Sequence, residues 1–511
     1  MDDFWDLRHQ ARRAPQHIAV QCGDECLTYS ELEALANRLA AVLRGLGLQR
    51  GDHIASLIGN RSEALALAWA AWRSGLYLTP MSTALTSHEL RYLVEDSDAK
   101  VVFAEASMRE LAAPLPALLA PSSGAVQHWF SLRGSIPGFL EVEPLLAKAS
   151  PEPQADEPPG SLMMYTSGTT GQPKGVIRPF RPADWRGTPP FAADLIALFG
   201  VAGDHVRYLS TAPLYHAAPL RFALAVTAGG GTVFVMERFD AEGALRLLER
   251  EAISHSQWVP AMFQRLLALP KARRAGFKSD AHRMAIHGAA PCPAALKRAM
   301  IDWWGPILVE YYAGSEGVGL TMIDSHEALQ RPGSVGRARK GVLHICDEAG
   351  TELPTGQSGL VRFEGVAPFA YHKAPEKTAA RTSSQGWQTL GDIGHVDAAG
   401  YLYLTDRQDD MIISGGVNIY PQEIESELMR LDSIADCAVV GWPDERFGET
   451  PVAFVVAAPG TAANPATLVS AIQAHCEKHL GRFKRPEIRL VDSLPYSPTG
   501  KLLRRELRRA V

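Results

Sequence analysis

The segment from Tyr165 to Gly175 carries residues of the types and spacing that bind phosphate. It reads YTSGTTGQPKG and follows a short apolar run, so a strand should lead into a loop rich in hydroxyl groups. Glycines let backbone N–H groups point at oxygen atoms, the hydroxyls add donors, and Lys174 supplies a positive charge. A Walker A loop would need Ser or Thr after its lysine, whereas Gly175 follows Lys174. The segment therefore predicts a different polyphosphate loop, with a plain polar hairpin as the alternative.

The elements around this loop predict an α/β protein. Residues 28–46 open with a Ser or Thr cap and have helical apolar spacing, the segment GDHIASLI reads as a strand, and the same alternation recurs through residues 63–104. Such alternation is typical of parallel sheets covered by helices. The Pro- and acid-rich residues 149–160 should form a surface loop. Short strands and two helices after about residue 400 predict a small α+β C-terminal domain.

The composition favours a multidomain globular protein that acts on small molecules. The 511 residues are 46% hydrophobic and 21% charged with a net charge of −5, which does not favour disorder or nucleic-acid binding. No apolar stretch is long enough to span a membrane, although peripheral membrane contact stays open. Six cysteines form no dense framework and no signal peptide is evident, so we expect a cytoplasmic protein.

Two short patterns resemble metal sites, namely Cys22 with Cys26 and His475 with His479. Neither has a second ligand pair at a recognisable spacing, and short patterns of this kind are often false positives. We therefore interpret the cysteines as part of a hairpin and the histidines as an exposed helix face.

The phosphate loop is similar to the signature of the AMP-forming adenylating enzymes, which include acyl-CoA synthetases, peptide-synthetase adenylation domains and luciferases. Four further segments match in the expected order: EYYAGSEG from Glu310, LGDIG from Leu390, YLTDRQDDMIISGGVNIYPQEIE from Tyr403 and LPYSPTGKLL from Leu494. Two positions depart from the family pattern, since Ala313 replaces a glycine and Ser315 a threonine. The resemblance spans nearly the whole chain.

This resemblance implies a large N-terminal domain of helix-covered sheets with a distorted β-barrel subdomain, residues 1–408, and a mobile C-terminal domain, residues 409–511. It implies ATP and Mg²⁺ at the N-terminal domain. Tyr312 would stack on adenine, Asp392 would accept bonds from the ribose hydroxyls, and Glu316 would hold the metal ion. The implied ATP or AMP contacts are Thr166, Ser167, Gly168, Thr169, Thr170, Lys174, Gly288, Ala289, Ala290, Tyr312, Ser315, Asp392 and Arg407.

The resemblance also implies catalytic and acceptor residues. Lys501 would act in adenylation together with Glu316, and His216 would orient the substrate carboxylate. Asp409 would be the hinge between the two half-reactions. Ser414, Gly415 and Gly416 would line a CoA channel, with Lys484 and Arg485 at its mouth; a solvated helix end is the alternative for these two basic residues.

The implied function is an acyl-CoA synthetase that adenylates a carboxylic acid and transfers the acyl group to CoA. The implied acyl pocket contains Tyr215, Ala217, Ala218, Gly314 and Gly317. Small residues there and at Gly288, Ala289 and Ala313 favour a medium- or long-chain acid, or another bulky apolar acid, over acetate. A second pocket charge for a dicarboxylate or an amino acid is not evident, although Arg221 is either such a charge or a surface residue. The alternatives are loading of a carrier protein, a luciferase-type oxygenase and a non-catalytic adenylate sensor; either a monomer or a homodimer is compatible with the sequence.

Overall fold

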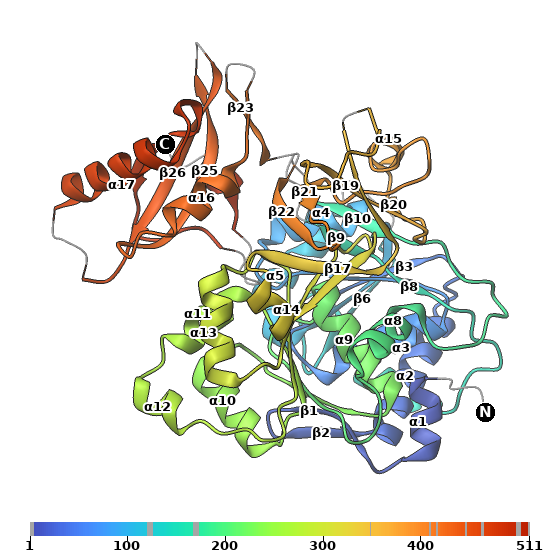
Figure 1. Ribbon diagram of the computed structural model, residues 1–511. Helices are drawn as coiled ribbons and strands as arrows, with labels where there is room; N and C mark the ends of the chain where they lie inside the picture. Colours follow the sequence, from blue (N-terminus) through green and yellow to red (C-terminus); the bar gives the residue numbers. More distant parts are fainter. Residues whose placement is uncertain are drawn as a thin grey trace.

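The computed structural model describes residues 5–119, 126–166, 173–347, 349–407, 410–414, 417–444, 447–460, 464–496 and 502–508. Two large sheets with their covering helices form the main body, and the last part of the chain forms a smaller lobe at the upper left of Figure 1. The predicted α/β class with a small C-terminal domain is confirmed. Among the described residues, no helix is long and apolar enough to cross a membrane.

The first sheet has six strands in the order β7-β6-β5-β3-β4-β8, and all its neighbours are parallel. Helix α2 (Tyr29–Gly45) begins where predicted, because Thr28 and Glu31 form a reciprocal capping box. The strands are β3 (His53–Leu57), β4 (Tyr77–Pro80), β5 (Ala99–Glu105), β6 (His128–Leu132), β7 (Leu140–Glu141) and β8 (Ser161–Leu162), and their helices include α3 (Ser62–Arg73) and α4 (Ser87–Asp96).

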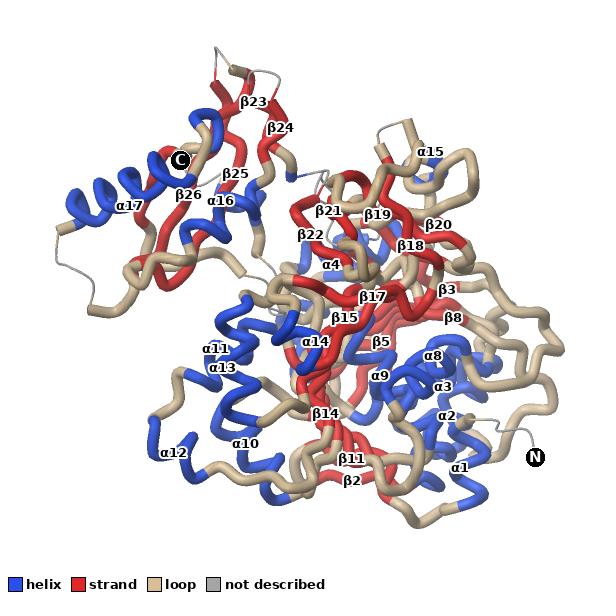
Figure 2. The backbone as a smooth tube through the Cα atoms, viewed as in Figure 1, coloured by secondary structure: helices blue, strands red, loops and turns tan. Residues whose placement is uncertain are grey.

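The second sheet has 13 strands, of which β15, β14, β13, β11, β12 and β1 form a parallel run. Alternate residues of this run face different cores: Tyr208 packs with α8 and α9, while Leu209 packs with α10, α11 and α13. Figure 2 shows these two groups of helices on either side of the strands. The strands are β1 (Ile18–Cys22), β2 (Glu25–Thr28), β11 (Arg207–Ser210), β12 (Thr232–Val235), β13 (His255–Trp258), β14 (Met284–His287) and β15 (Leu308–Tyr312), and the helices are α8 (Pro190–Phe199), α9 (Ala217–Gly229), α10 (Ala241–Arg250), α11 (Pro260–Leu267) and α13 (Ala294–Trp304).

The strands expected to form a distorted barrel make the antiparallel end of the same 13-stranded sheet. They are β16 (Leu320–Asp324), β17 (Ser334–Lys340), β18 (Val342–Cys346), β19 (Gly359–Glu364), β21 (Asp392–Val396) and β22 (Leu402–Arg407). A third, three-stranded sheet of β9 (Met164–Thr166), β10 (Lys174–Ile177) and β20 (Ala370–Tyr371) shares a hydrophobic core with them. This arrangement brings β10, at the end of the phosphate loop that carries Lys174, next to Ala370 and Tyr371 of β20, which lie far along the chain.

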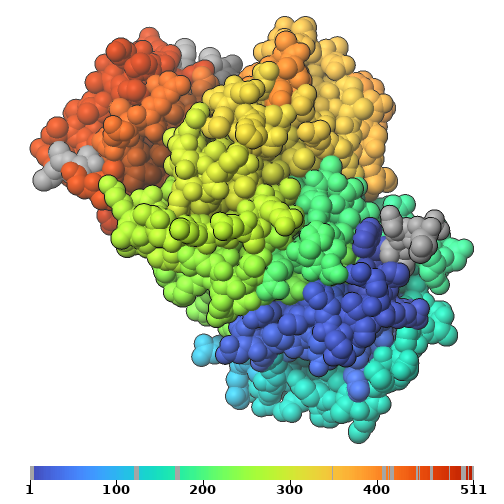
Figure 3. All heavy atoms as spheres, turned by 60° about the horizontal axis from the view of Figure 1, so that its bottom comes forward, coloured from blue at the N-terminus to red at the C-terminus, as the bar shows by residue number. Residues whose placement is uncertain are grey.

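The C-terminal lobe is built on a sheet in the order β24-β23-β26-β25, with β27 parallel to β26. Helices α16 (Pro421–Leu428) and α17 (Pro465–His479) bury Ile424 and Ile472 against it. The strands are β23 (Ile412–Ser414), β24 (Val417–Ile419), β25 (Ile434–Asp444), β26 (Gly448–Ala457) and β27 (Glu487–Leu490). The domain boundary predicted near residue 408 falls between β22 of the large sheet and β23 of the small one. Figure 3 shows the lobe at the end of the molecule away from the N-terminal helices.

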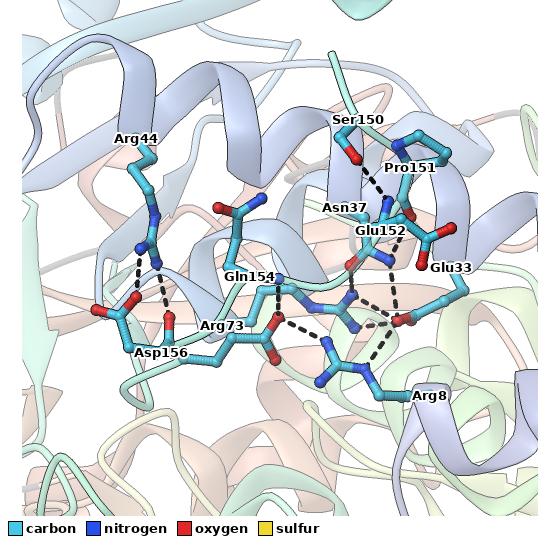
Figure 4. A network of polar contacts seen from close by, with 11 residues as sticks. Arg8, Glu33, Asn37, Arg44, Arg73, Ser150, Pro151, Glu152, Gln154 and Asp156 are labelled. Atoms are coloured by element: carbon cyan, nitrogen blue, oxygen red, sulfur yellow. Dashed lines mark hydrogen bonds and ion pairs between the residues drawn. The ribbon is translucent and has the colours of Figure 1, made fainter.

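The loop predicted at residues 149–160 crosses the surface between the first two sheets and is held there by a polar network (Figure 4). Glu33 of α2 lies at the centre: Arg73 of α3 donates to both of its carboxylate oxygens, at 3.0 and 2.9 Å, and Arg8 of α1 (Leu7–Arg13) donates at 3.1 Å. Arg8 also bonds Glu157 of the loop, and Asn37 donates to the carbonyl of Pro151. Burial alone would raise the pKa of Glu33, but Arg73 and Arg8 more than offset it and hold the pKa below its usual value.

We expect Glu33→Gln to lower the free energy of unfolding by about 3 kcal/mol, because Arg73 would be left as a buried charge without its carboxylate. Urea titration followed by intrinsic tryptophan fluorescence, to which Trp69 and Trp72 on α3 contribute, measures this loss. Because the folded pKa of Glu33 is lowered, its contribution is present above the unfolded pKa and is lost as the pH falls through the folded value. The difference between the two proteins should therefore shrink in acid. Glu152→Gln, an exposed change in the same loop, is the control; equal stability of both variants would contradict the role of Glu33.

Candidate active site

A line of contacts runs from Lys174 to Tyr371 in the three-stranded sheet and on to Glu316, which follows β15 of the 13-stranded sheet. The Lys174 ammonium lies 5.1 Å from the centre of the Tyr371 ring, and the Tyr371 hydroxyl donates to Glu316 Oε1 at 2.9 Å. Burial and then the charge of Glu316 raise the pKa of Tyr371, so this hydroxyl stays protonated and acts as a donor. The structure thus brings together the predicted lysine of the phosphate loop and the predicted metal ligand, and it adds Tyr371, which the sequence did not indicate.

Tyr312 and Asp392, the predicted adenine and ribose contacts, lie side by side. Tyr312 is the last residue of β15 and its hydroxyl donates to Asp392 Oδ2 at 2.5 Å. Asp392 is only 5% exposed and begins β21, where its cross-strand partner is Arg407 of β22. The described backbone therefore gathers these three predicted nucleotide contacts at one place.

The predicted adenine loop at residues 288–290 follows β14 in a constrained backbone. A side chain at Gly288 would begin 2.7 Å from the carbonyl oxygen of Tyr311, so only glycine fits there. Ala289 is exposed and has a φ of 69°, a left-handed conformation that is costly for a residue other than glycine. Such strain is concentrated at ligand-binding sites, and this loop lies directly beside Tyr311 and Tyr312.

His216 caps the start of α9, which places the following residues Ala217 and Ala218 in its first turn. The His216 ring lies 4.5 Å from that of Tyr215, which is 7% exposed, and both alanines are half-buried. The predicted carboxylate-orienting and pocket residues therefore sit together at one helix end.

The glycines expected to enlarge the acyl pocket do not border empty space, so that part of the volume argument is wrong. A side chain at Gly314 would meet Leu390 at 2.5 Å, one at Gly317 would meet the Arg178 guanidinium at 1.5 Å, and Gly288 faces the carbonyl of Tyr311. These positions are glycine because neighbouring groups approach closely. The volume argument then rests on the alanines at 217, 218, 289 and 313.

Two arginines adjoin this site; the sequence did not indicate Arg178 and left Arg221 as either a pocket charge or a surface residue. Arg178, just after β10, donates to the carbonyl of Glu316 at 2.6 Å, and Arg221 of α9 donates to the adjacent carbonyl of Ser315 at 3.2 Å. Arg221 is therefore an interior residue of the site rather than a surface charge. It is half-buried by accessible area, yet the protein around its guanidinium, together with the charge of Arg178, lowers its pKa to about 10.

Several predicted residues lie outside the described part of the chain. They are Ser167, Gly168, Thr169, Thr170, Asp409, Gly415, Gly416 and Lys501. The segments on either side of Lys501 are anchored to the C-terminal lobe: Tyr496 donates to Asp436 at 2.8 Å, and Arg504 forms a two-pronged ion pair with Glu425. Thr166, which ends β9, lies directly across from Lys174 in the small sheet.

The predicted CoA-channel residues that the structure describes make contacts within the C-terminal lobe. Lys484 is ion-paired with Glu423, at 2.6 and 2.8 Å to its two carboxylate oxygens. Arg485 donates to the carbonyls of Leu480 and Glu477 at the end of α17, which is the helix-end alternative considered for it. Ser414 is 3% exposed at the end of β23.

The remaining short patterns have clear structural settings. Cys22 and Cys26 lie on the adjacent strands β1 and β2, as the hairpin interpretation predicted. His475 and His479 were expected on an exposed helix face. His479 is exposed, whereas His475 is half-buried and its Nε2 lies 3.0 Å from Glu427 Oε1 of α16. The sequence could not show this because Glu427 lies 48 residues away from His475.

Comparison with known proteins identifies the family. The chain matches the AMP-binding enzyme family over residues 7–369 and the AMP-binding enzyme C-terminal domain over residues 423–501. It is 32% identical to the long-chain-fatty-acid–CoA ligase FadD13 of Mycobacterium tuberculosis, covering 99% of this chain and 97% of that protein. It is 33% identical to the fatty acid–[acyl-carrier-protein] ligase ScoC of Streptomyces coeruleorubidus, covering 98% and 94%. The crystal structure of ATP-bound MatB from Rhodopseudomonas palustris superposes with a TM-score of 0.82 at 30% identity, covering 99% and 98%.

The chain belongs to the AMP-binding enzyme family. Within that family it is an acid–thiol ligase of the acyl-CoA synthetase branch, which uses a carboxylic acid, ATP and CoA. The recognition made from the sequence motifs is thus confirmed.

We expect Tyr371→Phe to reduce the turnover of adenylation about tenfold with little change in the KM for ATP. The variant loses the hydroxyl that orients Glu316 but keeps the ring beside Lys174. Tyr371→Ala, the matched control, removes both contacts and should also raise the KM for ATP. ATP–pyrophosphate exchange measures both parameters; identical effects of the two variants would contradict the separate roles of hydroxyl and ring.

Proposed function

We propose that this chain converts a carboxylic acid, ATP and CoA into an acyl-CoA, AMP and pyrophosphate through an enzyme-bound acyl-adenylate. The observation that carries the proposal is the contact line from Lys174 through Tyr371 to Glu316, beside the Tyr312–Asp392 pair. The site thus combines the Lys174 cation, which suits phosphate, with the Glu316 carboxylate and with the Tyr312–Asp392 pair, which suits a nucleoside.

In the first half-reaction a carboxylate oxygen of the acid bonds to the α-phosphorus of ATP, and the bond to pyrophosphate breaks. Lys174 stabilises the departing pyrophosphate, and His216 orients the carboxylate at the start of α9. Glu316 Oε1 accepts from Tyr371, while its Oε2 makes no hydrogen bond to any described residue, which fits the single carboxylate ligand that Mg²⁺ often takes from a protein. Mg²⁺ bound there would neutralise phosphate charge. Lys501 stabilises the charge that develops at the α-phosphate.

In the second half-reaction the CoA sulfur bonds to the acyl carbon, AMP leaves, and the thiol proton passes to solvent. The C-terminal domain, residues 409–511, turns about Asp409, withdraws Lys501 and presents the segment from Ser414 to Gly416 to the pantetheine arm. Lys484, which would meet the CoA phosphates, is ion-paired with Glu423 of the same lobe, so this pair would rearrange when CoA binds.

The acid has an apolar body larger than acetate. The start of the pocket is lined by the small side chains of Ala217, Ala218 and Ala313. The related protein FadD13 is named as a ligase of long-chain fatty acids. All six cysteines are free, which supports a reducing cytoplasm as the location.

Loading of an acyl carrier protein is the second candidate, because ScoC is named for that acceptor and matches nearly the whole chain. The two acceptors share the adenylation site and differ in what approaches the C-terminal domain. A non-catalytic sensor is disfavoured, since Lys174, Glu316, Asp392 and Lys501 are all present.

We expect Lys501→Ala to slow acyl-adenylate formation at least about 100-fold, because it removes the cation that stabilises the charge developing on the α-phosphate. Transfer from supplied acyl-adenylate to CoA should be largely retained. Pyrophosphate exchange and thioester formation measure the two half-reactions separately. Lys478→Ala, an exposed lysine on α17, is the control. Equal loss of both half-reactions would refute the assigned role.

The acyl acceptor and the acid class are tested by pyrophosphate release with a panel of acids, from acetate through long-chain fatty acids to aryl and steroid-side-chain acids. We expect continuous turnover with CoA and an acid larger than acetate. If pyrophosphate is released only once per enzyme with CoA, but continuously with a carrier protein, the acyl acceptor is a carrier protein and not CoA.

A further inference from the structure

Arg178 and Arg221 place two positive charges against neighbouring peptide groups at the edge of the predicted acyl pocket. Arg221 donates to the carbonyl of Ser315 and Arg178 to that of Glu316, and Arg178 fits only because residue 317 is glycine. Each guanidinium has five N–H donors, and each directs one hydrogen bond at another described residue. Most of this donor capacity remains for a ligand or for water.

No carboxylate of the described residues forms an ion pair with either arginine. Asp194 and Glu316 are the acidic groups whose charges act on Arg178, and both are engaged elsewhere: Asp194 pairs with Lys340 of β17, and the Glu316 carboxylate accepts from Tyr371. The positive charges of Arg178 and Arg221 are therefore not neutralised by an ion pair with any described residue.

The position of the pair points toward the acid rather than toward the nucleotide. The side chain of Glu316 faces Tyr371 and Lys174, whereas its carbonyl faces Arg178. Arg221 lies one helical turn after Ala217 and on the same face of α9, so it continues the row that begins at Ala217, the residue next to His216. The rise from residue 216 to residue 221 is about 7 Å along the helix.

We propose that Arg178 and Arg221 form a binding subsite for a second carboxylate on the substrate acid, at the end of its apolar body remote from the reacting carboxylate. The proposal rests on the acyl-CoA synthetase function and adds the class of acid. Arginine suits this task because its planar fork matches a carboxylate with two parallel hydrogen bonds. The subsite selects for a dicarboxylic acid and against an apolar acid of the same length, whose hydrocarbon end would leave both cations desolvated without a partner.

The test compares acids of equal length that differ only in the distal group: hexanoate with adipate, and octanoate with suberate. In the wild-type protein we expect kcat/KM for acid-dependent pyrophosphate release to favour the dicarboxylate of at least one pair by about tenfold or more, the effect of a charge-assisted hydrogen bond. Arg178→Leu and Arg221→Leu should each reduce or reverse this ratio through the KM of the dicarboxylate, and Arg221→Lys should restore part of it. Thermal unfolding verifies that each variant is folded, and the ratio is insensitive to a general loss of active enzyme.

The outcomes separate this proposal from the proposed function. Turnover of hexanoate or octanoate with no preference for the dicarboxylate would overturn the subsite and leave the synthetase function intact. Leucine variants that lose activity equally with both members of a pair would also overturn it, because the arginines would then serve the reacting carboxylate or the phosphates. Absence of pyrophosphate release with every acid, including those of the wider panel, would instead refute the proposed function.

Discussion

Glu316 connects two sheets, and the arrangement of the candidate site depends on this connection. Its carboxylate accepts from Tyr371 on β20 and its carbonyl accepts from Arg178 after β10, while its own segment continues from β15 of the 13-stranded sheet. The two contacts hold the small sheet that carries Lys174 against the strand that carries Tyr312. Because the hydroxyl of Tyr371 stays protonated, the contact with Glu316 does not add a second negative charge to the site.

The N-terminal domain balances its buried charges differently in its structural and functional regions. In the network around Glu33, Arg73 and Arg8 share one carboxylate with good geometry, and the result is a lowered carboxyl pKa and a fixed loop. Around Gly317 two arginines adjoin carbonyl dipoles rather than charges. Carbonyl groups compensate a guanidinium only in part, so the first arrangement stabilises the fold while the second favours a bound anion.

The C-terminal lobe combines a firm core with a separately placed catalytic segment. Ile424 and Ile472 bury two helices against its sheet, and Arg504 and Tyr496 anchor the chain on both sides of residue 501 to α16 and β25. The described residues on both sides of Lys501 therefore belong to the C-terminal lobe, which agrees with the proposal that this lobe moves as a unit.

The sequence by itself determined the family, the α/β class, the small C-terminal domain and most of the helix and strand positions, because glycine spacing, capping residues and hydrophobic periodicity act over short stretches of chain. The Thr28 cap, the strand before the phosphate loop and the hairpin between Cys22 and Cys26 are of this kind. Tyr371 and Arg178 could not be found in that way, and for Arg221 the sequence could not decide between the pocket and the surface. Each contacts its partner across 55 to 138 residues of sequence, and which groups meet is decided only when separate sheets pack. For the same reason the sequence suggested a larger pocket at Gly314 and Gly317, because glycine has no side chain. In the folded chain Leu390 and Arg178 fill that space.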